Sequence, residues 1–306
     1  MSKFTIGTDP EFFLRNKLTG ELVSAVPYVQ GTKYEPQLLP AGGNIQRDNV
    51  AVEVATDPAA NMESFIEAIR SVLTEAIKVL PKETEIIAIP SATFNPEELK
   101  SPEAMEFGCD PDYDAWAKKI NEKPCAKDVT FRSCGAHIHV GTTGEDENAF
   151  LTTFDGKLTT VKVMDCIHGV LATILDSGQE AIDRRKLYGK AGAHRPTSYG
   201  VEYRVLSNFW LRSPVTVMLM WSLTNDTLDI IRDGKADALI DALGSENVQR
   251  VINEGDTTTA MRMVEQTILP MLSNDSRFYF NEALAKVRAN DMDFHGEWKL
   301  YGKEGK

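Results

Sequence analysis

The chain has 306 residues, of which 42% are hydrophobic, and this content is enough for a sizeable buried core. Its formal net charge of −12 at pH 7 argues against a nucleic-acid backbone or an anionic membrane as the main partner, although local arginines can still attract a small anion. The N-terminal residues lack an apolar core of signal-peptide length and no stretch approaches a membrane span, so the sequence predicts a soluble cytoplasmic protein whose four cysteines are reduced thiols.

The N-terminal part of the chain predicts β-structure. Residues 4–14 form a first strand with Asp9-Pro10 in its middle. Because proline has no N–H to donate, this strand should lie at a sheet edge or bend at that point. Residues 20–29 are expected to pair with it as a hairpin, and residues 49–55 form a second clear strand.

A helix is predicted after the second of these strands. Asp57 is expected to be its N-cap, with Pro58 in the first turn. Apolar residues then recur at helical spacing over residues 62–77. Residues 85–89 predict a further strand.

The second half of the chain changes from mixed to helical. After a loop-rich region at 90–128, strands are expected at 129–142 and 201–207 and a buried helix at 158–177. From residue 214 onward the pattern is helical, with helices expected at 215–231, 235–243, 257–272 and 274–287. Strands separated by hairpins and helices, followed by a helical C-terminal third, predict an α+β fold. The glycine-rich GxGxxG and GxxxxGK[ST] loops of common nucleotide-binding folds are absent from the sequence.

Chemically active side chains recur two residues apart in three of these strands. Two such residues of a strand lie on the same face of its sheet. The pairs are Asp9 and Glu11, His137 and His139, and Glu202 and Arg204. A solvated sheet face with cross-strand ion pairs would account for each pair alone. Their recurrence, together with Glu53 in a fourth strand and Asp48 nearby, favours a divalent metal site instead.

A cluster of basic residues precedes Glu202 in this acidic protein. It contains Arg184, Arg185, Lys186, Lys190, His194 and Arg195. A solvated basic loop is one interpretation. The other is a phosphate clamp, because arginine presents planar, bidentate donors to phosphate oxygens.

Four segments resemble the metal-binding strands of the glutamine synthetase superfamily, which includes the glutamate–cysteine ligases. In chain order they are IGTDPEFFL, NVAVEVAT, GAHIHVG and GVEYRVLS. The stretch from Arg185 to Arg204 is most similar to the carboxylate–amine ligases encoded by tailed bacteriophages. Asp9 departs from the superfamily pattern, which has glutamate there, and Asp48 is the candidate for a second acid beside Glu53.

The resemblance implies a fold and a set of partners. It implies one catalytic domain over residues 1–306, with a curved, mostly antiparallel sheet flanked by helices and a helical extension at 236–306. It also implies an ATP-dependent ligase that joins a small-molecule or peptide carboxylate to an amine through an acyl phosphate. An oligomer is compatible with it.

The resemblance also implies a role for each site residue. One Mg²⁺, or Mn²⁺ in its place, would be held by Glu11, Glu53 and Asp48, and a second by Asp9, His137 and Glu202. His139 would contact the nucleotide. Arg185, Arg195 and Arg204 would bind the transferred phosphoryl group.

Two other interpretations stay open at this point. A mononuclear iron enzyme of oxygenase type would use His137, His139 and one carboxylate, but it leaves the arginines without a role. A phage protein that retains the ligase fold without turnover is the second alternative.

Overall fold

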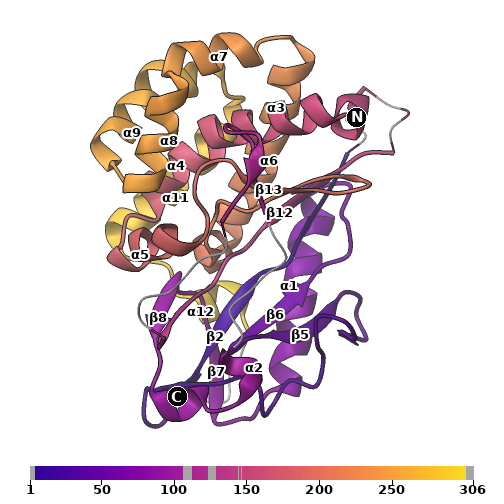
Figure 1. Ribbon diagram of the computed structural model, residues 1–306, viewed down its shortest axis with the longest axis vertical. Helices are drawn as coiled ribbons and strands as arrows, with labels where there is room; N and C mark the ends of the chain where they lie inside the picture. Colours follow the sequence, from indigo (N-terminus) through magenta and orange to yellow (C-terminus); the bar gives the residue numbers. More distant parts are fainter. Residues whose placement is uncertain (1–3, 106–111, 123–128, 144, 146, 301–306) are drawn as a thin grey trace.

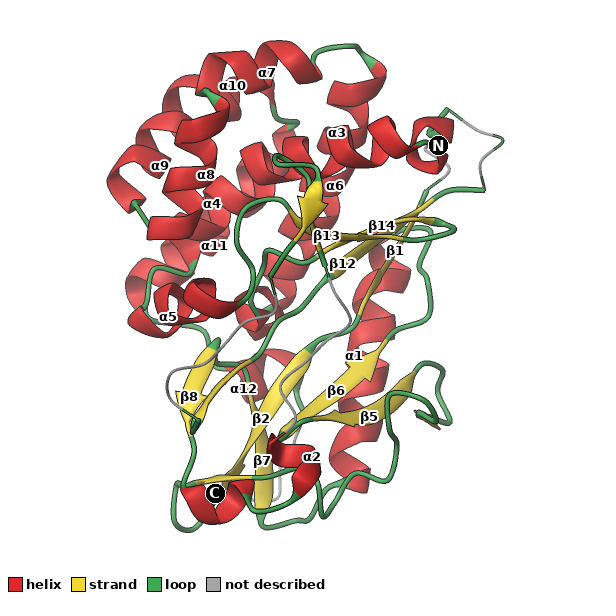
Figure 2. Ribbon diagram, in the orientation of Figure 1, coloured by secondary structure: helices red, strands yellow, loops and turns green. Residues whose placement is uncertain are grey.

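The computed structural model describes residues 4–105, 112–122, 129–143, 145 and 147–300. It has an α+β fold in which a curved, antiparallel β-region is covered by helices, and the expected fold class is confirmed (Figure 2). In Figure 1, the strands around β2 and the helix α1 (Met62–Val79) occupy one half of the molecule, and the helices from α3 (Phe154–Met164) onward fill most of the other.

All pairings between the described strands of the two larger sheets are antiparallel. One sheet has the order β1 (Thr5–Thr8), β12 (Ile138–Gly141), β14 (Gly200–Tyr203), β13 (Ala193–Pro196), β9 (Tyr113–Asp114) and β10 (Lys119–Ile120). The other has the order β3 (Leu22–Val23), β2 (Glu11–Asn16), β6 (Ala51–Ala55), β5 (Asn44–Asp48) and β4 (Gln37–Leu38), with β7 (Thr84–Ile87) also on β2. A small third sheet pairs β8 (Ser91–Thr93) with β11 (Phe131–Ser133).

The chain passes from the first sheet to the second at Asp9-Pro10. The strand predicted over residues 4–14 is therefore two strands, β1 and β2, and the expected bend at the proline is confirmed. It is not an edge, because Leu14 and Arg15 of β2 pair with β3 on one side and with β7 on the other, and Glu11 and Phe12 pair with β6. The Pro10 carbonyl still accepts a hydrogen bond from the N–H of Val54 at 3.0 Å. The proline thus bends the chain while its carbonyl stays hydrogen-bonded to β6.

Helix α1 begins four residues later than the sequence suggested. Its N-cap is Asn61, whose side chain accepts from the Ser64 N–H in a reciprocal capping box. Asp57, the expected cap, instead accepts a hydrogen bond from the N–H of Gly43 at 3.2 Å. The expectation was wrong because two cap signals lie close together and tertiary contacts use the first one elsewhere.

The remaining helices follow in chain order. They are α2 (Pro102–Met105), α3, α4 (Val170–Leu175), α5 (Gln179–Leu187), α6 (Pro214–Arg232), α7 (Ala236–Leu243), α8 (Ser245–Glu254), α9 (Thr257–Met263), α10 (Leu269–Met271), α11 (Asn274–Ala289) and α12 (Phe294–Trp298). A π-helical turn at Asp165–Gly169 joins α3 to α4. The span Phe154–Leu175 is long and apolar enough to cross a membrane, but 89% of its apolar window is buried within the fold. That burial is typical of a core helix.

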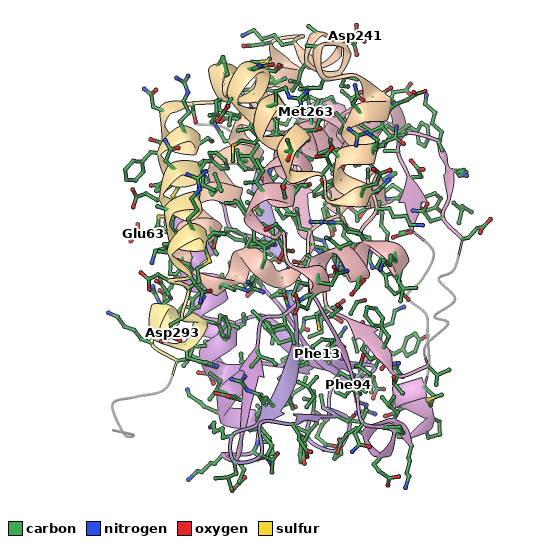
Figure 3. All side chains as sticks on the ribbon, turned by 90° about the vertical axis from the view of Figure 1, so that its left-hand side faces the viewer. Phe13, Glu63, Phe94, Asp241, Met263 and Asp293 are labelled. Atoms are coloured by element: carbon green, nitrogen blue, oxygen red, sulfur yellow. The ribbon has the colours of Figure 1, made fainter. Side chains whose placement is uncertain are left out.

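Two apolar clusters form the core. The larger one lies between the sheets and the helices, where Phe12 of β2 stacks on Phe294 at a centroid distance of 5.5 Å. The smaller one lies on the opposite face of β2, where Phe13 meets the edge of Phe94 at 5.2 Å (Figure 3). Strand β2 is therefore buried on both faces, and its one acidic residue, Glu11, is buried with it. Of the cysteines, Cys134 and Cys166 are buried free thiols, and the other two lie outside the described residues.

The long strand predicted over residues 129–142 is interrupted between β11 and β12. At this break the Gly135 N–H donates to the Glu11 carboxylate at 2.7 Å, and the Gly135 carbonyl accepts from the Glu11 N–H at 2.9 Å. The backbone groups of Gly135 therefore bind an acidic residue of β2 instead of continuing the strand.

Asp165 ties three segments together from within the core. Its buried carboxylate accepts from Trp116 Nε1 at 2.6 Å, the Gly192 N–H at 2.6 Å and the Tyr203 hydroxyl at 2.8 Å. An Asp165→Asn exchange would turn an N–H₂ group toward at least one of these donors. We expect a loss of about 1–3 kcal/mol of unfolding free energy, measured by urea denaturation.

Asp155→Asn is the matched control for Asp165→Asn, because the Asp155 side chain is 87% exposed on α3. Its unfolding free energy should stay within about 0.5 kcal/mol of the original chain. Equal midpoints for the two variants would contradict the role of Asp165.

Candidate metal and phosphate site

Three carboxylates converge where β2, β5 and β6 run side by side. Glu11 of β2 lies directly opposite Glu53 of β6, and Asp48 ends β5. One oxygen from each of these residues lies within 4.8 Å of the others. We call them the acid cluster. Glu53 is also held by Gln46, whose amide nitrogen donates to it at 2.9 Å.

A second group gathers on the neighbouring sheet, just across the Asp9-Pro10 bend. Asp9, His139 and Glu202 each place one ligand atom within 4.8 Å of the others. The strand register explains this, because His139 of β12 lies opposite Glu202 of β14. We call these residues the imidazole cluster. The acid cluster and the imidazole cluster lie next to each other because Asp9 and Glu11 flank Pro10 in the chain.

His137 lies beside the imidazole cluster. Its Nδ1 is 3.0 Å from Asp9 Oδ1, 3.4 Å from Glu202 Oε1 and 3.2 Å from the NH1 group of Arg204. The sequence paired Asp9 and Glu202 with His137 alone, but both histidines lie near these carboxylates. His137 differs from His139 because it also lies beside the guanidinium of Arg204.

Two arginines cover the Glu202 side of the site. Arg204 is buried, its NH1 group donates to Glu202 Oε1, and its Nε lies 3.6 Å from Asp112 Oδ2. Arg195 of β13 lies opposite Glu202 in the register and places its NH1 group 3.4 Å from the same carboxylate. Arg195 and Arg204 are two of the three arginines that the sequence predicted to bind phosphate.

The third predicted arginine, Arg185, lies elsewhere. The stretch that looked like a basic loop begins as helix α5, and neighbouring residues of a helix point in different directions. Arg185 is buried beneath α5, with its NH2 group 3.4 Å from the Asp176 carbonyl. Arg184 faces the site instead, beside Gly135 and Gly189. The sequence carried little signal for Arg184, because residues 179–187 are rich in charge and their apolar face is short.

Arg184 is held by backbone groups. It is 2% exposed, and its NH1 group donates to the Val205 carbonyl at 2.9 Å. Its Nε has no hydrogen-bond partner, and among the described residues no carboxylate lies within 4.0 Å of the guanidinium. Gly189 lies beside this guanidinium with a φ of +74°, and a Cβ there would come within 2.7 Å of the Val205 carbonyl, so glycine is favoured.

Burial disfavours the ionised form of each carboxyl group in the acid cluster. Burial, followed by repulsion from Asp48, raises the pKa of Glu11 to about 8, although the Gly135 N–H opposes this. Burial and the neighbouring acids Asp9 and Asp48 raise the pKa of Glu53 well above its ordinary value. The pKa of Asp48 is raised by burial as well. Three buried acids with raised pKa values form a site that gains from a bound cation.

The imidazole cluster behaves differently. Burial would raise the pKa of Asp9, but the nearby His137 and His139 outweigh it and hold that pKa well below its ordinary value. Glu202 is similar, since Arg204 and His137 overcome its burial and lower its pKa. Asp9 is therefore ionised in the folded protein.

The residues present fit divalent cations. Asp9 Oδ1 and His139 Nε2 are both buried and make no well-aligned hydrogen bond, although they are 3.3 Å apart and His137 Nδ1 is 3.0 Å from the same oxygen. Unpartnered buried polar atoms are rare in folded proteins. Carboxylate oxygens alone suit Mg²⁺, and carboxylates with an imidazole suit Mn²⁺ as well.

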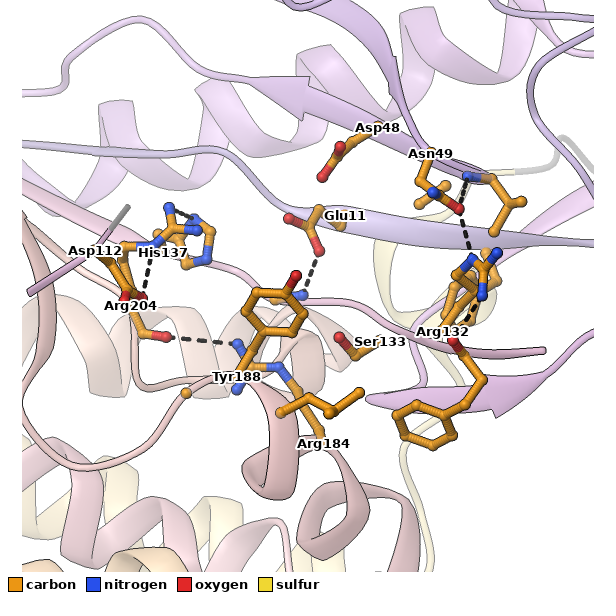
Figure 4. A pocket seen from close by; sticks show the side chains of 17 residues that line it. Glu11, Asp48, Asn49, Asp112, Arg132, Ser133, His137, Arg184, Tyr188 and Arg204 are labelled. Atoms are coloured by element: carbon orange, nitrogen blue, oxygen red, sulfur yellow. Dashed lines mark hydrogen bonds and ion pairs between the residues drawn. The ribbon is translucent and has the colours of Figure 1, made fainter. Parts of the chain in front are cut away.

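A pocket opens beside the two clusters and contains about 710 Å³ of space, part of it open to solvent. In Figure 4, Glu11 and Asp48 face Tyr188 and Arg184, while His137 and Arg204 lie at one end of the pocket. Apolar residues complete the wall, among them Phe13, Val50, Phe131 and Leu187. The pocket therefore places polar and apolar side chains next to the carboxylates of the acid cluster.

Comparison with solved structures finds several ligases. Glutamate–cysteine ligase from Francisella tularensis, solved in complex with AMP, matches all of this chain and 86% of its own, with a TM-score of 0.53 and 10% identity. Its likeness supports the fold. A bifunctional glutathione synthetase from Pasteurella multocida (TM-score 0.40, 12% identity, 93% of this chain) and a glutamine synthase homolog (TM-score 0.44, 12% identity, 98% of this chain and 71% of its own) are more distant. This chain spans only 52% of the glutathione synthetase.

No curated protein sequence matches the chain. A family model does, that of the phage phiEco32-like COOH·NH2 ligases of type 2. The match runs over residues 124–298, which is more than half of the chain, and includes both histidines and all the arginines of the site. The fold and the matched segment agree, and the chain belongs to the phage phiEco32-like COOH·NH2 ligase-type 2 family.

Proposed function

We propose that this protein is an ATP-dependent carboxylate–amine ligase that forms an amide bond through an acyl phosphate. The observation that carries the proposal is the pair of neighbouring clusters, each with ligand atoms within 4.8 Å of one another, flanked by two arginines on Glu202. Membership of the ligase family supports the reaction class.

The acid cluster would hold one Mg²⁺ and the imidazole cluster another. When bound, these cations would neutralise the charge that develops on the phosphate oxygens during transfer. Arg204 and Arg195 lie on the Glu202 side and would donate hydrogen bonds to the phosphoryl group. Both arginines are oriented by Glu202 before any substrate arrives.

The reaction would proceed in two steps. A carboxylate oxygen of the substrate attacks the γ-phosphorus of ATP, and the bond to ADP breaks. The amine nitrogen then attacks the acyl carbon and loses a proton, phosphate leaves with the C–O electron pair, and an amide forms. Neither step requires a nucleophile of the protein. This agrees with the state of Cys134, a buried thiol whose pKa is raised well above its ordinary value by burial.

The carboxylate substrate would occupy the open pocket. Arg184 lines it with no carboxylate partner within 4.0 Å among the described residues, so it would bind an acidic group of the substrate. The apolar wall around Phe13 and Leu187 would contact the carbon skeleton. We further propose that residues 1–306 act as one catalytic domain in the cytoplasm and that residues 236–306 extend it.

The proposal is tested by product formation. Incubation with ATP, Mg²⁺ and pooled carboxylates and amines should release ADP and phosphate only when both substrates are present. Stoichiometric bound iron without nucleotide binding would contradict the ligase and favour the mononuclear metalloenzyme.

Glu202→Gln should remove at least 99% of this turnover, because the variant loses a cation ligand and the partner of two arginines. Circular dichroism should show that it remains folded. Glu147→Gln is a suitable control, since Glu147 is half-exposed in an ion pair with Arg232 outside the site. Full activity in the Glu202 variant would contradict its role.

A further inference from the structure

Asp112 is an acid of the pocket that belongs to neither the acid cluster nor the imidazole cluster. Among the described residues that line the pocket, the other two acids are Glu11 and Asp48, and both are members of the acid cluster. In Figure 4, Asp112 lies beside His137 and Arg204 at one end of the pocket. The proposed cations therefore leave the Asp112 carboxylate without a role.

Strand register places Asp112 on the face of the sheet that carries the site. Strand β9 pairs with β13 as far as Tyr113, which lies opposite His194. One step further, the antiparallel register sets Asp112 beside Arg195, and Arg195 in turn pairs with Glu202 of β14. Residues that pair directly across antiparallel strands share a face. Asp112 thus extends the row of site residues by one strand.

Contacts within the hairpin of β9 and β10 orient the Asp112 side chain. Asn121 donates from its backbone N–H to the Asp112 carbonyl at 2.9 Å and from its side chain to Oδ1 at 3.0 Å. Trp116 attaches the same hairpin to the core through its hydrogen bond to Asp165 at 2.6 Å. The second carboxylate oxygen, Oδ2, lies 3.6 Å from Arg204 Nε, which is too long for a good hydrogen bond. Oδ2 is therefore held at the pocket with capacity to accept a hydrogen bond.

The charges at this end of the pocket explain why a carboxylate is needed there. Amines are protonated at neutral pH, and an ammonium group is repelled by the guanidinium groups of Arg195 and Arg204. Glu202 is already bound to both arginines and belongs to the imidazole cluster. Of the described acids at this end, Asp112 is the one that can compensate the charge of a bound ammonium group.

Resting on the proposed ligase function, we propose that Asp112 binds the amine substrate as an ammonium ion through Oδ2. The substrate class is then an amine that is cationic in solution. Arg184 and Asp112 would distinguish the two substrates by charge, since Arg184 binds the acid and Asp112 binds the amine.

Two nucleophiles of similar size and different charge test this role, namely methylamine, which is cationic, and hydroxylamine, which is mostly uncharged at slightly alkaline pH. Asp112→Asn removes the charge but can still accept the hydrogen bond from Asn121. With saturating ATP and carboxylate, the KM of this variant for methylamine should rise about tenfold or more, and its KM for hydroxylamine should stay within about threefold. Asp112→Glu restores the charge and should recover part of the methylamine affinity.

Glu122→Gln is the matched control, because Glu122 is an exposed acid that follows β10, and its KM values should equal those of the original chain. A thermal scan should show that the Asp112 variants remain folded. If Asp112 only orients Arg204, its exchange should lower kcat or raise the KM for ATP, with equal effects on both nucleophiles. That result, or an unchanged KM for methylamine, would overturn the proposal and leave the ligase function intact. Absence of turnover by the original chain with any amine would overturn both.

Discussion

Replacing Glu53 with Gln is expected to make the metal-free protein more stable while it removes ligase activity. The acid cluster forces Glu53 close to Glu11 and Asp48, with one oxygen from each within 4.8 Å of the others. Burial and the neighbouring acids raise the pKa of Glu53 well above its ordinary value, so the folded chain resists its ionisation. Glutamine has the same shape, carries no charge, and can still accept the hydrogen bond from Gln46. We expect a gain of about 1–3 kcal/mol in the unfolding free energy at pH 8 without metal.

The pH dependence of the metal-free protein follows from the same groups. The folded chain raises the pKa of Glu11 from 4.5 to about 8, so between these values it binds protons that the unfolded chain releases. The stability of the metal-free protein should therefore fall as the pH rises through this window. Because Glu53 has a pKa raised in the same direction, Glu53→Gln should lessen the fall. Urea denaturation in a chelating buffer at several pH values measures both slopes.

Activity should change in the opposite direction. Loss of one carboxylate from the acid cluster removes a cation ligand, which we expect to lower kcat/KM at least about 100-fold, equivalent to about 3 kcal/mol. Glu85→Gln is the matched control, because Glu85 is a partly buried acid outside the site, 2.7 Å from Arg15 and 3.5 Å from His295. It should keep its activity and lose at most about 1 kcal/mol of stability. A Glu53→Gln chain that is both active and less stable would contradict the assignment.

Strand periodicity is local, so the sequence alone could point to these acids and imidazoles. Residues two apart in a strand share a face, which related His137 to His139. The same rule placed Asp9 and Glu11 on one strand face, but the chain changes sheet between them, and they lie in different clusters. Which of these residues meet is decided by strand register, which depends on pairing between distant segments. The pairing of Glu11 with Glu53 and of His139 with Glu202 therefore required the structure.

The arginines show a second limit of the sequence. Arg184 and Arg185 are adjacent in the chain, and in a loop either could reach the phosphate site. Helix α5 resolves the choice by geometry, turning Arg184 toward the pocket and Arg185 toward Asp176. The helix was missed because its apolar face is short and its sequence is rich in charge.

The interruption of the strand at Gly135 has a similar origin. Residues 129–142 have the composition of one continuous strand, but the backbone of Gly135 binds Glu11, which is distant in the chain. Local propensity does not contain this contact. Departures from local pattern are common at functional sites, and here the buried carboxylate of Glu11 takes a backbone N–H from regular structure.

Exchanging Arg184 for Gln is expected to raise the KM for the carboxylate substrate by about 30-fold or more. The buried guanidinium of Arg184 lines the pocket and has a donor without a partner, so loss of a charge-assisted contact to an acidic group should cost at least about 2 kcal/mol. Arg184→Lys keeps the charge but loses the planar donors, and its KM should lie between those of the original chain and the glutamine variant. Steady-state kinetics at saturating ATP and amine give these values.

Arg185→Gln is the matched comparison, since it changes the same side chain one position along the same helix. Its guanidinium lies near the Asp176 carbonyl and away from the pocket, so the KM should stay within about threefold of the original, while the thermal midpoint falls because a buried donor is lost. A thermal scan of each variant separates this loss of stability from a loss of binding. The opposite result, in which Arg185→Gln raised the KM and Arg184→Gln did not, would contradict the orientation of α5. It would favour Arg185, which the sequence assigned to the site. An increase confined to Arg184 would instead identify this residue as the one that binds the acidic substrate.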